Sequence, residues 1–208
     1  MRLFFKCIMG IFFLLAAIGL LMLIPSPQPD DPKPWEISIM PDEQIKVMGI
    51  HLGTTRYAEV QQIWREAGEV AIFAEENQAP SAEVFFDALN LGGLSARAVL
   101  NLQVDSDKLQ AMTSRAISGK LQPSGARRYD LAFDDQQELL AAPVTAITYI
   151  PSVRLDAEML SKRFGKPIAI QQESAESATE IWDYSTSGLT IRLHPDERPI
   201  LTYTARNL

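Results

Sequence analysis

Residues 94–104 read LSARAVLNLQV, and this stretch is the clearest strand signal in the chain. Every second residue from Leu94 to Val104 is apolar, and the residues between them are polar with the exception of Val99. Such an alternation places one apolar face on a core and leaves the other face to solvent. The stretch therefore predicts a half-buried antiparallel strand, and the turn residues 90–93 before it predict a hairpin.

The elements on either side of this strand define a first predicted unit, residues 35–119. Apolar residues recur at helical spacing before the hairpin, and Gly68 follows them as a stop signal. The pattern predicts a helix at 55–67, strands at 69–75, 82–89 and 94–104, and a second helix that begins at Asp105 or Ser106 and ends near Gly119.

A similar order of elements recurs after a connecting segment, residues 120–143. A short helical stripe ends at Gly165 within a second unit, residues 144–208, and antiparallel strands are predicted after it at 168–172, 180–184, 189–194 and 200–205. The recurrence is consistent with a duplication or with two unrelated units, and the sequence leaves both open. The predicted fold class is α+β, with two helix-plus-antiparallel-sheet units after one N-terminal transmembrane helix.

The transmembrane prediction concerns an uncharged apolar run at residues 7–24. As a helix the run is about 27 Å long, close to the hydrocarbon thickness of about 30 Å. A cleaved leader usually has a shorter apolar region, followed by a small-x-small site. The one such triplet, at 17–19, would leave an apolar overhang on the new N-terminus. We expect a retained anchor, with a cleaved leader as the alternative.

The flanking charges predict the orientation of this anchor. Arg2 and Lys6 precede the run, so residues 1–6 are expected in the cytoplasm. The proline-rich residues 25–34 favour an extended stalk. Beyond Cys7 the chain has no cysteine, and it has no Asn-x-Ser/Thr acceptor, which suits a bacterial periplasm. The predicted location is the bacterial inner membrane, with the bulk of the chain in the periplasm.

Charge and residue types restrict the possible functions. The chain has 26 acidic and 19 basic residues and a net charge of −7, which argues against nucleic-acid binding. The absence of cysteine beyond Cys7 excludes a thiol nucleophile and a zinc–thiolate site from that part of the chain. We expect no metal and no cofactor.

The second unit carries short motifs that resemble a known family. They are Leu155–Leu160, Phe164–Pro167, Trp182–Tyr184 and Gly188–Leu193. Their order resembles that of BamE/SmpA-type envelope modules, although this chain lacks a lipoprotein cysteine and carries a second, larger unit. The resemblance implies a helix layer on an antiparallel sheet and a non-catalytic role in protein contacts at the cell envelope.

The sequence offers little for catalysis. His51 and His194 are the two histidines, and both fall at predicted turns or strand ends without suitable ligands at metal-binding spacing. Ser124 lacks the glycines of a nucleophile elbow. We predict that the chain is not an enzyme. A hydrolase would require one of the histidines to lie within hydrogen-bond reach of a serine or carboxylate in a cleft.

The candidate partner-binding residues lie on the strand at 82–89 and in the connecting segment. Alternation places Phe85 and Leu89 on the face opposite Val84 and Phe86. They would be exposed unless residues 120–143 cover that face, and exposed apolar patches often mark interfaces. Arg127 and Arg128 are a second candidate, with a solvated loop as the alternative.

These patterns predict a membrane-anchored periplasmic module that binds or scaffolds another envelope protein. The alternative function is binding of a small ligand or a peptidoglycan fragment in a groove between the two units, which a closed apolar pocket with converging polar groups would favour.

Overall fold

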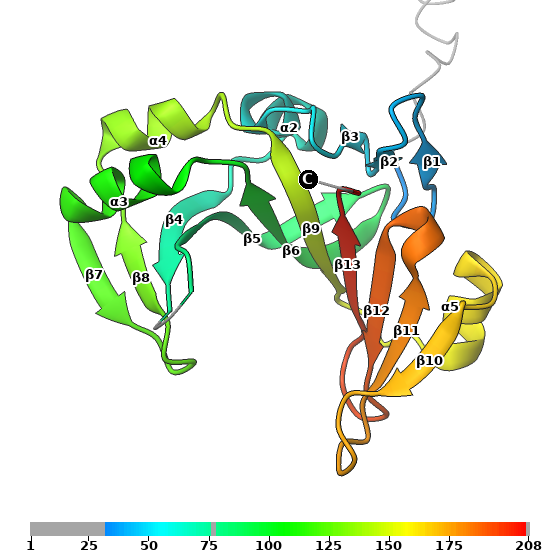
Figure 1. The fold of residues 1–208 in the computed structure, drawn as a ribbon. Coiled ribbons are helices and arrows are strands. Elements are labelled where there is room, and N and C mark those ends of the chain that lie inside the picture. Colours follow the sequence, from blue (N-terminus) through cyan, green and yellow to red (C-terminus); the bar gives the residue numbers. More distant parts are fainter. Residues whose placement is uncertain (1–31, 76–77, 207–208) are drawn as a thin grey trace, which may run out of the picture. The chain divides into compact units, whose positions relative to one another are not determined.

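The strand at residues 94–104 lies at the centre of a ten-stranded antiparallel sheet (Figure 1). A computed structural model describes residues 32–75 and 78–206, so the predicted anchor at 7–24 and most of the predicted stalk lie outside the described residues. The strand order is β10–β11–β12–β13–β9–β6–β5–β4–β8–β7. Their bounds are β4 Glu69–Ala74, β5 Ser81–Leu91, β6 Leu94–Leu102, β7 Ser118–Leu121, β8 Arg127–Asp130, β9 Val144–Pro151, β10 Ala169–Gln172, β11 Glu180–Tyr184, β12 Leu189–Leu193 and β13 Ile200–Thr204.

The predicted fold class is wrong, because the protein is mostly β-sheet and the two halves of the chain share this one sheet. The junction is the pairing of β6 with β9, in which Ala98 lies opposite Tyr149 and Leu100 opposite Ile147. Each half on its own would leave an unpaired strand edge at this junction. Pairing the two edges satisfies their backbone groups, and the described residues accordingly form a single compact unit.

Four short helices accompany the sheet: α2 Tyr57–Trp64, α3 Ser106–Ser114, α4 Phe133–Leu139 and α5 Ala157–Phe164. Helix α2 occupies the middle of the predicted range 55–67 and buries Tyr57, Val60 and Trp64. In the described part of the chain, no helix is both long and apolar enough to cross a bilayer.

Gly68 has a different role from the predicted helix stop, because α2 already ends at Arg65, whose φ of 56° is left-handed. A Cβ atom on Gly68 would lie 2.5 Å from a Val84 methyl carbon and 2.8 Å from the Phe85 carbonyl oxygen. Glycine is therefore required here because the chain passes so close to β5.

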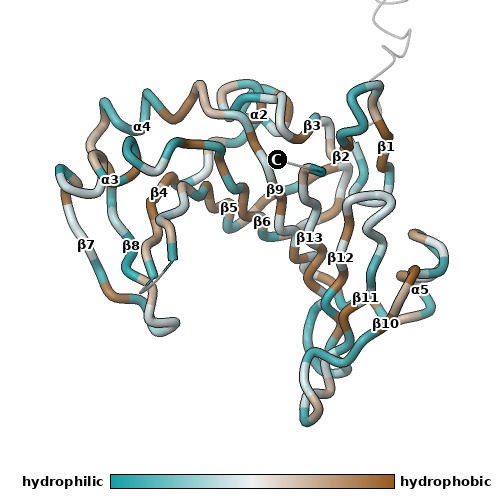
Figure 2. Tube along the Cα trace, in the orientation of Figure 1, coloured by the Kyte–Doolittle hydropathy of each residue, from teal (hydrophilic) through white to brown (hydrophobic). Residues whose placement is uncertain are grey.

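The core lies between one face of the sheet and the helices. Figure 2 shows polar and apolar positions alternating along the strands, and the apolar positions of β6 are the buried ones. Trp64 of α2 contacts Phe86 edge-on, at 5.1 Å between ring centroids. At the other end of the sheet, Phe164 of α5 packs on Tyr184 at 6.2 Å. Cross-strand register places Phe86 and Tyr184 on the same face, so α2 and α5 cover one side of the sheet.

A small three-stranded sheet precedes α2 and has no counterpart in the predicted elements. It consists of β1 Ser38–Ile39, β2 Ile45–Val47 and β3 Ile50–His51. Strands β2 and β3 are joined by Met48 and Gly49, whose φ values of 49° and 81° form a tight left-handed turn. The Met48 carbonyl accepts a hydrogen bond from the Trp64 indole N–H at 3.0 Å, which fastens this sheet to α2.

Candidate functional site

The prediction that Phe85 and Leu89 share one face of β5 fails for Leu89, because a β-bulge interrupts the strand. Phe86 pairs with Ala98, but the next pairing is Leu89 with Ala96, so β5 carries an extra residue between them. A bulge reverses the alternation beyond it. Phe85 therefore remains 38% exposed, whereas Leu89 turns into the core and is 1% exposed. Leu89 is unable to contact a partner in this conformation.

The connecting segment 120–143 packs at the sheet end and beside α2. Strands β7 and β8 extend the sheet beyond β4, and α4 lies next to α2. The Tyr57 and Ala58 N–H groups donate to the Ala142 and Leu140 carbonyls, each at 3.0 Å. The segment thus contributes one sheet edge and a helix, and Phe85 keeps its exposure.

Arg128 and Phe85 share a neighbour on the open face of the sheet. Glu69 lies opposite Phe85 in register, and its carboxylate accepts a hydrogen bond from Arg128 at 3.1 Å. Arg128 also lies 3.4 Å from the carboxylate of Asp130, whose pKa is lowered by a hydrogen bond from Ser118 and by the charges of Lys120 and Arg128. Arg127 is exposed. Arg128 therefore stabilises the pairing of β4 with β8, whereas Arg127 is exposed and forms no ion pair with another described residue.

The histidines lie apart from each other. His51 contacts the carboxylate of Asp42 at 3.0 Å, and Asp42 is about half exposed. His194 accepts a hydrogen bond from the Asp196 backbone N–H at 3.1 Å, at the rim of a cavity of about 270 Å³. Neither histidine hydrogen-bonds a serine among the described residues, and those residues contain no group of three metal-ligating side chains.

Strand β10 is an edge strand of the large sheet. It pairs with β11 on one side, and within residues 32–75 and 78–206 no strand pairs with its other side. Ile168, just before the strand, and Ile170 within it are 59% and 51% exposed. The strand itself was predicted, at 168–172, but its place at the edge depends on the order of all ten strands.

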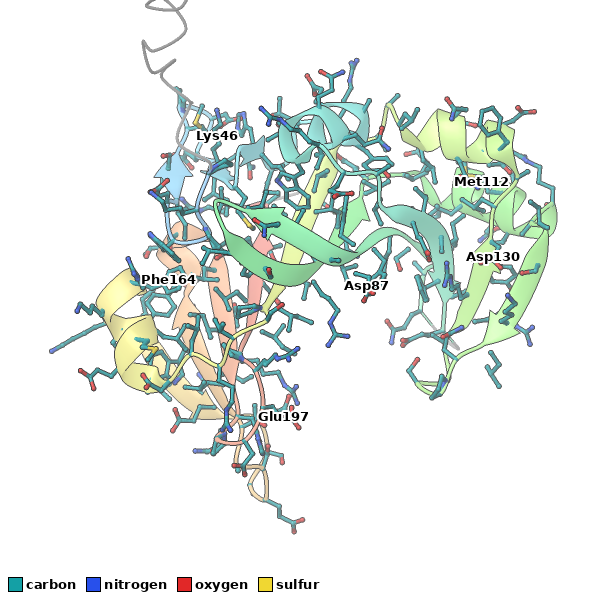
Figure 3. All side chains as sticks on the ribbon, turned by 180° about the vertical axis from the view of Figure 1, so that it is seen from behind. Lys46, Asp87, Met112, Asp130, Phe164 and Glu197 are labelled. Carbon is teal, nitrogen blue, oxygen red and sulfur yellow. The ribbon has the colours of Figure 1, made fainter. Side chains whose placement is uncertain are left out.

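An apolar groove of about 560 Å³ lies between α5 and the sheet. Its floor includes Tyr149 and Leu201, which are 2% and 1% exposed. Met159 and Phe164 of α5 line one side, and Figure 3 shows Phe164 at the end of the sheet opposite Asp130. The lining residues are Pro34, Trp35, Gly93, Leu94, Ser95, Tyr149, Pro151, Ser152, Val153, Leu155, Met159, Lys162, Arg163, Phe164 and Leu201.

Two contacts fix the N-terminal part of this groove. The Tyr203 hydroxyl is buried and donates a hydrogen bond to the Pro34 carbonyl at 2.8 Å. The Arg163 guanidinium lies 4.3 Å above the ring centre of Trp35, a cation–π arrangement. The last residue of the predicted stalk and the residue after it are thereby held against β13 and α5. No pattern in the sequence predicted this groove, because it joins residues more than a hundred positions apart.

Comparison of the chain with models of known protein families, with curated proteins and with solved structures finds no match. The likeness to BamE/SmpA-type modules stays a prediction from the motifs, and the site rests on its own geometry.

Proposed function

We propose that the chain is a non-catalytic, membrane-anchored periplasmic module that binds another protein of the bacterial envelope. In this proposal the partner contributes an extended segment that adds as a further strand to β10. The observation that carries the proposal is the edge of β10, with which no strand of the described residues pairs and beside which two large apolar side chains are exposed.

The residues of β10 favour strand addition. An edge strand presents unpaired N–H and C=O groups, and soluble proteins usually protect such edges with charged residues, proline or bulges. Residues 169–172 read AIQQ and carry no charge and no proline. Recognition by strand addition uses the free backbone groups for affinity and the alternate side chains for specificity.

The opposite edge of the sheet, β7, differs in this respect. Residues 118–121 read SGKL, and Lys120 lies 3.5 Å from the carboxylate of Asp130. A charged residue in the middle of an edge strand disfavours pairing with another chain. Leu121 is 69% exposed, more than Ile170. The exposure of the apolar side chains alone would favour β7. The choice of β10 therefore rests on the absence of charged residues from this strand, in contrast to Lys120 in β7.

The expected gain from apolar contact at β10 is modest. Burying a whole isoleucine side chain is worth about 1.5–3 kcal/mol, so the exposed halves of Ile168 and Ile170 offer about 1 kcal/mol each. Backbone hydrogen bonds along four residues would add to this. The apolar contacts and hydrogen bonds together fit a weak interaction. Such an interaction is strengthened when both partners are held in the same membrane, because their effective concentration is then higher.

The test is photo-crosslinking in cells with the full-length, membrane-anchored chain. A photoreactive amino acid is placed at Ile170, at Leu121 as the matched edge control, and at Phe85 on the open sheet face. The proposal expects a discrete crosslinked protein from Ile170 and none from Leu121. A discrete product from Leu121 or Phe85 with none from Ile170 would move the interface to those surfaces and reject strand addition at β10.

The alternative function, binding of a small ligand or a peptidoglycan fragment, has one specific observation in its favour. This is the apolar groove beside α5, which brings together Gly93–Ser95 from the first half of the chain and α5 from the second. A lining of this kind suits a hydrocarbon ligand better than a sugar polymer, since sugars need converging polar groups.

A further inference from the structure

We infer that the groove beside α5 binds a single-chain anionic amphiphile, with its hydrocarbon chain along the apolar floor and its carboxylate head at Lys162 and Arg163. This site is separate from the β10 edge, and Ile168 and Ile170 are not among its lining residues. The inference rests on the shape of the groove, on its charge and on the Tyr149 hydroxyl in its lining.

The shape suits one hydrocarbon chain. A volume of about 560 Å³ lies in the range of about 300–1,000 Å³ that is typical of small-molecule pockets. Met159 and Val153 line the groove and are 51% and 58% exposed, so apolar surface there faces solvent. Exposed apolar surface of this kind is stabilised when a hydrocarbon covers it.

The charge of the groove differs from that of the rest of the surface. Acidic residues outnumber basic ones in the chain, yet no acidic residue of the described ranges lines this groove, where Lys162 and Arg163 are the charged residues. Three other cavities of the described unit each contain two or more carboxylates, among them Glu180 and Glu197, Glu69 and Asp87, and Glu75 and Glu83. Among the described residues, neither Lys162 nor Arg163 forms an ion pair.

The position of these cations has a local cause as well, because basic residues in the last turn of a helix stabilise its C-terminus. That cause accounts for two basic residues at the end of α5. It leaves unexplained the absence of carboxylates from the described lining and the Tyr149 hydroxyl, which no described residue hydrogen-bonds.

Tyr149 supplies a polar group within the apolar floor. Its side chain is 2% exposed and lines the groove, and burial raises the pKa of its hydroxyl. No described residue hydrogen-bonds this hydroxyl. The hydroxyl oxygen is open to solvent, since among the described residues the buried side-chain polar atom without a partner is Arg128 Nε. A carboxylate oxygen of a ligand in the groove would accept its hydrogen bond.

The residues on the N-terminal side of the groove link the groove to the predicted membrane anchor, and a membrane is a source of such ligands. Pro34, the last residue of the predicted stalk, and Trp35, the residue after it, line the groove. If residues 7–24 are the membrane anchor, residues 25–34 span at most about 31 Å as an extended polyproline helix. A groove on such a tether would remain close to a surface from which single-chain amphiphiles partition.

The test uses the full-length chain in phosphatidylcholine vesicles and a photoactivatable palmitate analogue, with labelled peptides identified by mass spectrometry. Labelling is expected on the peptide that contains Met159. The double variant K162E/R163E should reduce this labelling at least tenfold, whereas K166E, an exposed residue outside the groove, should leave it within twofold. The variant M159W, which fills the groove, should also abolish it, and circular dichroism checks that each variant is folded.

Competition distinguishes the sources of the ligand. Unlabelled palmitate should displace the probe, and hexadecanol, which has the same chain without the charge, should be at least tenfold weaker. Equal competition by hexadecanol, labelling confined to residues 7–24, or unchanged labelling in both K162E/R163E and M159W would overturn the inference. Stronger competition by phosphatidylglycerol than by palmitate would reject a single-chain ligand in favour of a two-chain lipid.

Discussion

Replacing Tyr203 by phenylalanine tests how the start of the globular unit is held to its core. The substitution removes only the hydroxyl, which donates a hydrogen bond to the Pro34 carbonyl at 2.8 Å, and the ring remains in place with 0% exposure. A net hydrogen bond is worth about 0.5–1.5 kcal/mol, and a buried carbonyl left without a partner costs about 1–3 kcal/mol unless water reaches it. We expect Y203F to lower the free energy of unfolding by about 1–2 kcal/mol.

Tyr149 provides the matched control for this measurement. It is buried on the same face of the sheet, but no described residue hydrogen-bonds its hydroxyl, so Y149F should change stability by less than about 0.5 kcal/mol. Thermal unfolding of the full-length chain in nanodiscs, followed by circular dichroism, gives the comparison. The expected loss for Y203F corresponds to a Tm lower by about 3–6 °C for a unit of this size. Equal effects of the two substitutions would refute the reasoning.

The same residue predicts a dependence on alkaline pH. Burial, with a smaller contribution from Tyr149, raises the pKa of Tyr203 well above its ordinary value of 10.0. A group whose pKa is raised in the folded state contributes stability that is fully present below its unfolded pKa and is lost as pH rises further. The wild-type chain should therefore lose stability above about pH 10, and Y203F should lose less over the same range.

Three further predictions follow from single residues. G68A should destabilise the chain by about 1–3 kcal/mol, measured by denaturant unfolding, because its new Cβ meets β5 at 2.5 Å, and an unchanged midpoint would contradict this close approach. The pKa of the Glu83 carboxyl is raised, chiefly by burial. E83Q should therefore raise Tm at pH 7, and this gain in Tm should shrink towards pH 4, where the folded and unfolded states both bind the proton. A gain in Tm that is constant with pH would contradict this. I170K should change the unfolding free energy by less than about 0.5 kcal/mol, because the side chain is half exposed at an edge, and a larger loss would show that Ile170 has a structural role instead.

Local patterns in the sequence predicted most elements of the large sheet, because each long strand alternates along its own length. The strand at 94–104 appears as β6 at 94–102, and the strand predicted at 180–184 appears as β11 with the same bounds. The missed strands at 38–39, 45–47 and 50–51 are only two or three residues long. An alternation needs four or more residues to be recognised. Strand β7 at 118–121 was also missed, because the second helix was predicted to end near Gly119, whereas α3 ends at Ser114.

What the sequence did not predict depends on contacts between distant residues. Nothing within 94–102 or 144–151 indicates that β6 pairs with β9, and this one pairing turns two predicted units into one sheet. The bulge between Phe86 and Leu89 likewise depends on the partner strand β6, so Leu89 was placed on the wrong face. The groove joins Trp35, Tyr149 and Met159, which come together only in the folded chain.

Strand addition at β10 is tested by the crosslinking yield from a photoreactive amino acid at Gln171 in the full-length chain in cells, with I170K and the matched edge variant L121K. We expect I170K to abolish the crosslinked product, L121K to leave its yield unchanged, and both variants to accumulate to the wild-type level. An undiminished product in I170K, or its loss in L121K alone, would reject β10 as the edge that receives a partner strand.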